Sequence, residues 1–301
     1  MNKLLYILAI LSISVILLDG TNVIADGAND DLTASVSIGS SAPTVGAISC
    51  VGGETFTLNS ETTKLVNCSA TITDLNGYQD INSVRGAFYS SAGEGDAADT
   101  RDNYKNATCV FTEAGTGTTR DAECSFTVYF HANPTSWTVY MNATDDGDDT
   151  GTNTVAATVN SLVALNVTET EINFGEVALG ATSSEITTNI KNTGNVDIDL
   201  NINETLYNGY MNCTDVASDD IQTDAASTGI RYNTTNGFTF ADTVWNVTAT
   251  NALADVSWVE ADQNGAPTAP TTPLYWLIKL PADGLTGSCS TTIRIAAAES
   301  S

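Results

Sequence analysis

The chain has 301 residues, with 36 acidic against 10 basic side chains, a formal net charge of −26 and a pI near 4.1. This charge argues against nucleic-acid binding and against docking on anionic membranes, because both need a basic patch. Hydrophobic residues make up 42 % of the chain, which is enough for packed cores and excludes simple disorder. A single histidine, His131, removes most histidine-based catalysis.

Residues 1–25 read as a signal peptide. Lys3 supplies the positive start, the apolar run Leu4 to Leu18 follows, and Ala25 ends a cleavage-like triplet. The apolar run is shorter than the roughly 20 residues that span a bilayer, so we expect no stable transmembrane anchor. An uncleaved anchor is the alternative. The mature chain is therefore expected to be secreted and held at the cell surface by contacts.

The six cysteines form an even set, which in this compartment predicts three disulfides. Six cysteines allow 15 pairings. If disulfides stay within domains, Cys213 pairs with Cys289. For the remaining four we favour Cys50–Cys68 and Cys109–Cys124, each bridging neighbouring strands.

Asn-x-Ser/Thr sequons are a second mark of secretion, although their number is close to chance for this composition. Their phase is more informative, because alternate residues of a strand face opposite sides. Several acceptors alternate with apolar residues, as Asn203 does with Ile198 and Ile202, so we expect them on the solvent side. The candidate glycosylation sites are Asn67, Asn106, Asn142, Asn166, Asn203, Asn212, Asn233 and Asn246.

The pattern along the chain is strand-like, since apolar and polar residues alternate and Gly/Asp/Asn clusters separate the runs. This predicts an all-β fold with two tandem Ig-like antiparallel β-sandwiches. We place the first sandwich at residues 44–160 and the second at residues 161–301. Residues 26–43 precede them as an N-terminal strand and linker.

Three stretches carry a family resemblance: WTVYMNATDDGDDTGTN, INFGEVALGATSSEITTNIKNTGNVDIDLNI and LYWLIKLPADGLTGSCSTTIRI. They resemble Ig-like domains of secreted prokaryotic surface proteins, of the kind found in small-genome archaea and candidate-phylum bacteria. More distantly, the second half is similar to TasA-type fibre subunits and related archaeal pilins. The resemblance covers most of residues 32–298. It implies a structural role and brings no catalytic residues.

The N-terminal strand is the feature most suggestive of function. Its apolar residues alternate with Thr and Ser, and the flexible stretch GSSAPTVG follows. A free strand on a linker is what strand addition between subunits requires, whereas an ordinary first strand would pair within its own domain. The candidate subunit-contact residues are Leu32, Ala34, Val36 and Ile38.

An acidic turn offers oxygen ligands for calcium, although the spacing misses the EF-hand pattern and a solvated turn is the alternative. The candidate ligands are Asp145, Asp146, Asp148 and Asp149, joined by Asp74 and Asp80 from another turn. We expect no other cofactor. His131 lies in phase with outward-facing residues of its run, and we expect no catalytic site and no enzyme activity.

The sequence thus predicts a structural subunit of an extracellular filament, pilus-like, or of a surface layer. Its partners would be further copies of itself or other cell-surface proteins. The alternative is a cell-surface adhesin or ligand-binding module that depends on calcium.

Overall fold

The computed structural model describes residues 33–90, 93, 101–214, 220–241, 245–247, 255–256, 268–269 and 271–300. These residues form strands, turns and irregular segments, with no helix among them, which confirms the all-β fold class. Residues 40–301 make one unit, and residues 1–39 belong to a separate one. The expected signal peptide, residues 1–25, lies outside the described residues.

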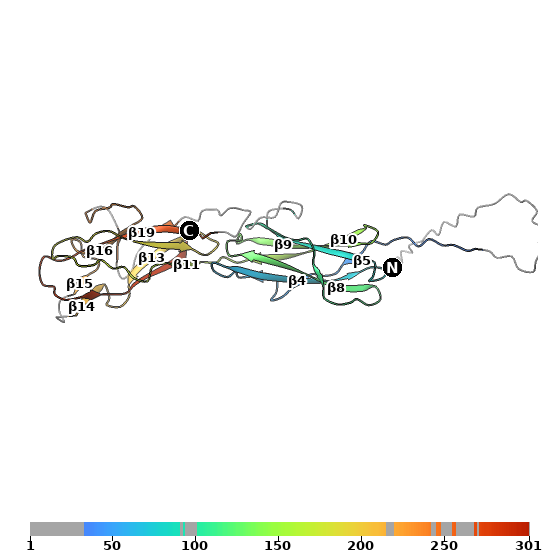
Figure 1. Ribbon diagram of the computed structural model, residues 1–301, viewed down its shortest axis with the longest axis horizontal. Coiled ribbons are helices and arrows are strands. Elements are labelled where there is room, and N and C mark those ends of the chain that lie inside the picture. Colours follow the sequence, from blue (N-terminus) through green and yellow to red (C-terminus); the bar gives the residue numbers. More distant parts are fainter. Residues whose placement is uncertain are drawn as a thin grey trace, which may run out of the picture. The chain divides into compact units, whose positions relative to one another are not determined.

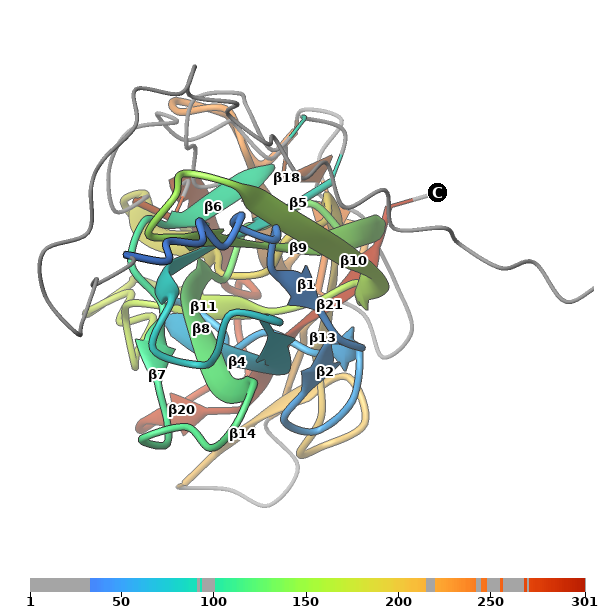
Figure 2. The same ribbon diagram turned by 90° about the vertical axis from the view of Figure 1, so that its right-hand side faces the viewer.

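The first sandwich has two layers, β1-β4-β8-β7 with β2 beside β4, and β3-β10-β9-β5-β6 (Figures 1 and 2). Its strands are β1 (Thr44–Val45), β2 (Ser49–Cys50), β3 (Thr55–Phe56), β4 (Thr63–Thr73), β5 (Ile81–Tyr89), β6 (Asn103–Asn106), β7 (Val110–Phe111), β8 (Thr119–Tyr129), β9 (Ser136–Asp145) and β10 (Thr150–Val159). Strand β3 pairs with β10 in parallel at the edge of a sheet whose other described pairings are antiparallel, as expected.

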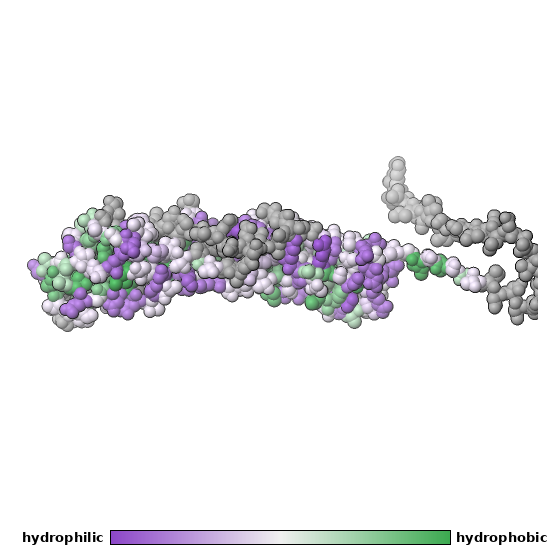
Figure 3. Space-filling model, turned by 45° about the horizontal axis from the view of Figure 1, so that its top comes forward, coloured by the Kyte–Doolittle hydropathy of each residue, from purple (hydrophilic) through white to green (hydrophobic). Residues whose placement is uncertain are grey.

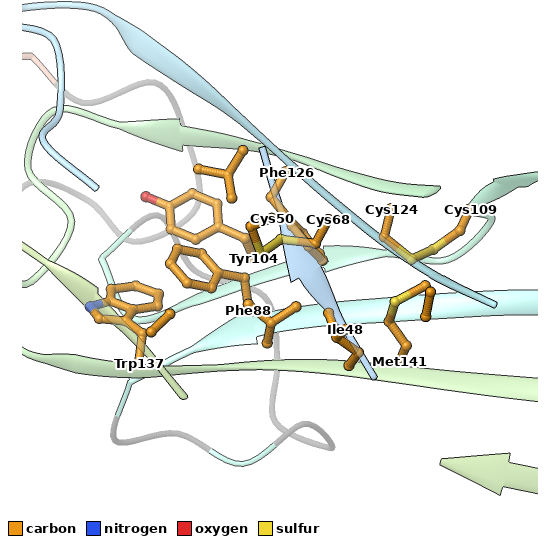
Figure 4. Close-up of a cluster of buried hydrophobic side chains, with 14 of the residues drawn as sticks. Ile48, Cys50, Cys68, Phe88, Tyr104, Cys109, Cys124, Phe126, Trp137 and Met141 are labelled. Atoms are coloured by element: carbon orange, nitrogen blue, oxygen red, sulfur yellow. A yellow bond between two sulfur atoms is a disulfide. The ribbon is translucent and has the colours of Figure 1, made fainter. Parts of the chain in front are cut away.

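The core of the first sandwich follows from alternation. In β4, for example, Val66 and Ile72 are fully buried while Leu65 and Thr71 point to solvent. Aromatic rings fill the centre, where Phe88 stacks on Trp137 with ring centroids 4.5 Å apart (Figure 4). Such stacked pairs add to the gain from burial alone.

The second sandwich begins after residue 164. One sheet has the order β11-β12-β19-β16-β17, and two three-stranded sheets have the orders β18-β13-β21 and β15-β14-β20 (Figure 1). The strands are β11 (Leu165–Val167), β12 (Ile186–Asn192), β13 (Ile198–Glu204), β14 (Tyr210–Cys213), β15 (Ile221–Gln222), β16 (Gly229–Asn233), β17 (Trp245–Asn246), β18 (Asp255–Val256), β19 (Thr271–Lys279), β20 (Cys289–Ser290) and β21 (Ile293–Glu299).

Strand β13 provides the clearest alternation of this core, since Ile198, Leu200 and Ile202 are all fully buried. The ring of Trp276 is also fully buried, and its Nε1 donates to Thr188 Oγ1 at 2.8 Å. That hydrogen bond removes the cost of burying the indole N–H.

Three disulfides join Cys50 to Cys68, Cys109 to Cys124, and Cys213 to Cys289, the pairs favoured from the sequence. Two of them cross between directly opposed residues, on β2 and β4 and on β14 and β20. No cysteine of the chain is free.

A buried asparagine joins the two sandwiches. Asn195 donates through Nδ2 to the carbonyl oxygens of Ala132 and Asn160, at 2.9 and 3.1 Å, and its Oδ1 accepts from the Leu162 N–H at 2.6 Å. Nearby, Lys191 Nζ pairs with Glu61 Oε1 at 3.2 Å. The hydrogen bonds of Asn195 hold the linker at residues 160–162, and the Lys191–Glu61 pair is a second contact between the two sandwiches.

Candidate functional site

The N-terminal segment, defined here as residues 33–38, lies in no strand, so the strand expected there is absent in the single chain. Every side chain in it is exposed, including Ala34, and Val36 and Ile38 reach 86 % and 84 % exposure. Leu32 lies outside the described residues. The expectation of an ordinary first strand paired within its own domain is therefore wrong for residues 33–38. Val36 and Ile38 are thus two large apolar side chains exposed within three residues of each other.

An open groove of about 950 Å³ lies in the second sandwich. One wall is residues 167–179, which follow β11, and the other is residues 285–295, which include β20 and the start of β21. The apolar side chains of the two walls include Ile172, Phe174, Val177, Leu285, Ile293 and Ile295. All six are only partly buried and pack against the core of the sandwich. The groove therefore opens directly onto this core.

Each wall of the groove has backbone groups that take part in no strand pairing among the described residues. Residues 170–177 form no strand, and the described part of the chain offers them no backbone–backbone hydrogen bond. Strand β21 pairs with β13 alone among the described strands, which leaves its other edge unpaired. Unpaired strand edges are templates for pairing with another chain. Figure 3 shows hydrophobic residues at the surface of this sandwich and along the N-terminal segment.

A cluster of carboxylates lies at one end of the first sandwich. Asp74 and Asp80 begin and end the loop between β4 and β5, and Asp145 ends β9. Each contributes a carboxylate oxygen, and these three oxygens lie within 4.8 Å of one another. The two loops are held together by the backbone, since the Asp146 N–H donates to the Asp80 carbonyl at 2.9 Å.

The structure thus brings together three of the six expected calcium ligands. Asp146, Asp148 and Asp149 point to solvent and lie outside this group. The pKa of Asp80 is raised, first by loss of hydration and then by the negative charges of Asp74, Asp145 and Asp146.

Most of the sequon asparagines are half-buried or exposed, as Asn203 and Asn166 are. Asn142 is a correction, because only 5 % of its surface is exposed. It lies on β9, the middle strand of its sheet, between its registered neighbours Arg85 on β5 and Thr152 on β10. A central strand with neighbours on both sides leaves little room for a glycan even on its outer face.

His131 is a second correction, since it is 1 % exposed and not a surface residue. Strand β8 ends at Tyr129, so the alternation that predicted an outward side chain no longer applies two residues later. The ring of His131 lies against Tyr129 and Phe130.

The groove was not foreseen from the sequence. Ile172 and Phe174 do alternate with polar residues, which is the signal of a half-buried strand. Alternation cannot say whether a neighbouring strand covers the apolar face, and here the face is left partly open.

No protein-family model and no curated protein matches the chain. Among solved structures, it is similar to a chain of a chaperone–tip adhesin complex of CFA/I fimbriae (9 % identity, 86 % of this chain and 84 % of that one, TM-score 0.34). A chain of the CsuC–CsuE chaperone–tip complex of Csu pili from Acinetobacter baumannii gives 10 % identity, 85 % and 99 % coverage and a TM-score of 0.35. The C-terminal domain of Streptococcus agalactiae BspA gives 11 % identity over 86 % of this chain and 100 % of that one, with a TM-score of 0.23. These TM-scores are too low for a shared overall fold.

The described residues include no helix that is long and apolar enough to cross a bilayer.

Proposed function

We propose that the protein is a secreted, non-catalytic subunit of an extracellular filament or surface layer, assembled by strand addition. Residues 32–38 of one copy would enter the groove of a second copy and pair with its unpaired edges. The observation that carries this proposal is the presence, in one chain, of an exposed segment with alternating apolar residues and a groove that has apolar side chains in both walls and unpaired backbone along them.

The dimensions of segment and groove agree. A strand rises about 3.3 Å per residue, so the seven residues 32–38 span roughly 23 Å. The wall at residues 170–177 would extend over about 26 Å at the same rise. An inserted strand could therefore pair along nearly the whole wall.

The chemistry also agrees. Side chains at alternate positions of the segment face one side, so Leu32, Val36 and Ile38 would turn together toward the open core. Burying these three contributes roughly 5–8 kcal/mol before ordering costs. The sequence LTASVSI carries no charge, so its insertion adds no repulsion in a chain of net charge −26.

The geometry of such an interface favours a polymer. The donor segment and the groove are different surfaces of the same chain, so each copy can give one strand and receive another. Interfaces of this heterologous kind produce open filaments unless the rotation between copies closes a ring. The three disulfides suit an oxidising, extracellular setting.

The test uses the mature protein, residues 26–301, with its disulfides formed. Light scattering and negative-stain microscopy should show filaments or lattices for the unchanged protein. The double variant Val36→Asp/Ile38→Asp should stay monomeric, because the new carboxylates would lose hydration against the apolar side chains of the groove and would be repelled by its glutamates, Glu169, Glu171 and Glu176. The matched control is Ser35→Asp/Ser37→Asp, which adds the same charge to the opposite face and should still assemble.

Normal assembly of Val36→Asp/Ile38→Asp, or of a chain that lacks residues 26–39, would contradict strand addition. An unchanged protein that stays monomeric and binds sugars or cells would instead favour an adhesin.

A further inference from the structure

We propose that Asp74, Asp80 and Asp145 form a calcium site that joins two parts of the first sandwich. The site lies where the β4–β5 loop meets the end of β9. This inference does not depend on the proposed function, because the carboxylate cluster lies in the first sandwich whereas the groove lies in the second. It can be tested on the monomer.

Burial is the first observation. Asp74 and Asp145 are 1 % and 0 % exposed, and their oxygens lie within 4.8 Å of that of the half-buried Asp80. Within the described residues no lysine or arginine forms an ion pair with any of the three. Buried carboxylates normally have a cation or a full set of hydrogen bonds, because the loss of hydration is otherwise costly.

An unused oxygen is the second observation. Asp74 Oδ1 accepts the Asn76 N–H at 2.7 Å, whereas Asp74 Oδ2 is buried and has no hydrogen-bond partner among the described residues. A buried carboxylate oxygen without a donor is a place where a cation or a water molecule can bind. The Asn76 N–H thus holds the Asp74 carboxylate in place through Oδ1, and Oδ2 of the same group stays available to a ligand.

Asp145 is arranged in a similar way. Its Oδ1 accepts the N–H groups of Gly147 and Asp149, at 2.9 and 2.8 Å, so the turn after β9 fixes the carboxylate. Its Oδ2 has only the Ser40 hydroxyl, at 3.3 Å, which is a long contact for an O–H donor. This oxygen, too, is available to a cation.

The donor set selects the ion. All three side chains offer oxygen, and calcium takes six to eight oxygen ligands in flexible geometry. Water and the Ser40 hydroxyl can supply the rest of the shell. Zinc prefers nitrogen and sulfur ligands, and magnesium demands a near-ideal octahedron. Neither ion therefore suits three carboxylates of which two lie on the β4–β5 loop and one at the end of β9.

Residues 40 and 41 also lie beside the proposed site. Ser40 contacts Asp145, and the Ser41 N–H donates to Asn76 Oδ1 at 2.8 Å. Residues 40 and 41 therefore contact one proposed ligand, Asp145, and also Asn76, whose N–H binds the carboxylate of another ligand, Asp74.

The test is calorimetric titration of the chelator-treated mature protein with CaCl₂, together with its melting temperature in calcium and in EDTA. We expect one equivalent to bind with Kd on the order of 10⁻⁴–10⁻³ M, the range of extracellular calcium modules. Calcium should raise the melting temperature, because it binds the folded state alone.

Asp80→Asn separates binding from folding, because Asp80 is the least buried of the three. This variant should bind calcium at least tenfold more weakly, yet melt at a higher temperature than the unchanged protein in EDTA, since repulsion is relieved. The matched control is Asp148→Asn, which changes an exposed acid in the turn after Asp145. Asp148 has a positive φ of 65°, which asparagine also tolerates. The control should bind as the unchanged protein does. Absence of calcium heat and of any melting shift, or equal loss in both variants, would overturn the site.

Discussion

The two sandwiches differ in how completely they enclose their cores. In the first, two five-stranded sheets cover a core that contains stacked Phe88 and Trp137 and two disulfides. In the second, the strands are divided among three sheets, and the side chains along 167–179 and 285–295 border a groove of about 950 Å³. The first sandwich thus encloses its core more completely than the second, and the proposed strand addition uses this difference. The two sandwiches are connected through the hydrogen bonds of Asn195 to Ala132, Asn160 and Leu162.

The largest expected effect on stability comes from the long disulfide of the open sandwich. Cys213 and Cys289 are 76 residues apart, against 15 and 18 in the closed one. On the chain-entropy model, Cys213→Ser/Cys289→Ser should cost about 4.5 kcal/mol and removal of a short disulfide about 3 kcal/mol. Denaturant unfolding of each double variant measures the difference. Equal losses would show that loop length does not set the contribution.

Removing a ring from the closed core is expected to cost nearly as much. Phe88 is fully buried and contacts the rings of Phe56, Trp137 and Phe126. Phe88→Ala should lower the free energy of unfolding by about 3–5 kcal/mol, because the cavity cannot collapse in a sheet-on-sheet core. A loss below 1 kcal/mol in urea unfolding would mean that this core is not closely packed.

A buried carboxylate makes the open sandwich sensitive to acid. Burial alone would raise the pKa of Glu204, but its hydrogen bonds from Thr291 and from the Gly209, Tyr207 and Leu206 N–H groups outweigh this and hold the pKa below its usual 4.5. A lowered pKa in the folded state contributes stability above pH 4.5, and this contribution is lost as pH falls through the folded value.

Glu204→Gln should therefore cost about 2–4 kcal/mol at pH 7, because an amide cannot accept at all these positions. The difference from the unchanged protein should shrink as the pH falls below 4.5, in melting curves recorded from pH 7 to pH 3. A difference that stays constant over this range would contradict the assignment.

The smallest expected effect on stability, paired with a large effect on assembly, belongs to the groove. Phe174 is only partly buried, so Phe174→Ala should cost the monomer no more than about 1–2 kcal/mol. It should nevertheless abolish or strongly reduce assembly measured by light scattering. Leu65→Ala, which shortens an exposed apolar side chain of the first sandwich far from the groove, is the control and should change neither property.

Much of the fold follows from local pattern. The alternation in β13 placed Ile198 and Ile202 in a core, and the half-by-half distribution of cysteines favoured the observed disulfide pairs. These features depend on the period of the strand and on proximity along the chain, which a sequence displays directly.

Other features depend on which neighbours meet, and the sequence could not supply them. The acidic run after β9 gives no sign that Asp145 turns inward while Asp148 and Asp149 turn outward. Asn142 reads as solvent-facing because alternation ignores the strands on either side. Likewise, the apolar residues around Phe174 predict a half-buried strand but not the groove beside it.

The most direct test of strand addition is to see which chain the N-terminal segment contacts. Chains with a photo-crosslinking residue in place of Val36 would be mixed with chains labelled with ¹⁵N, irradiated after assembly, and analysed by mass spectrometry. Strand addition predicts crosslinks from position 36 of one isotope to residues 167–179 or 285–295 of the other. Crosslinks confined to the same chain, or to other surfaces, would contradict it.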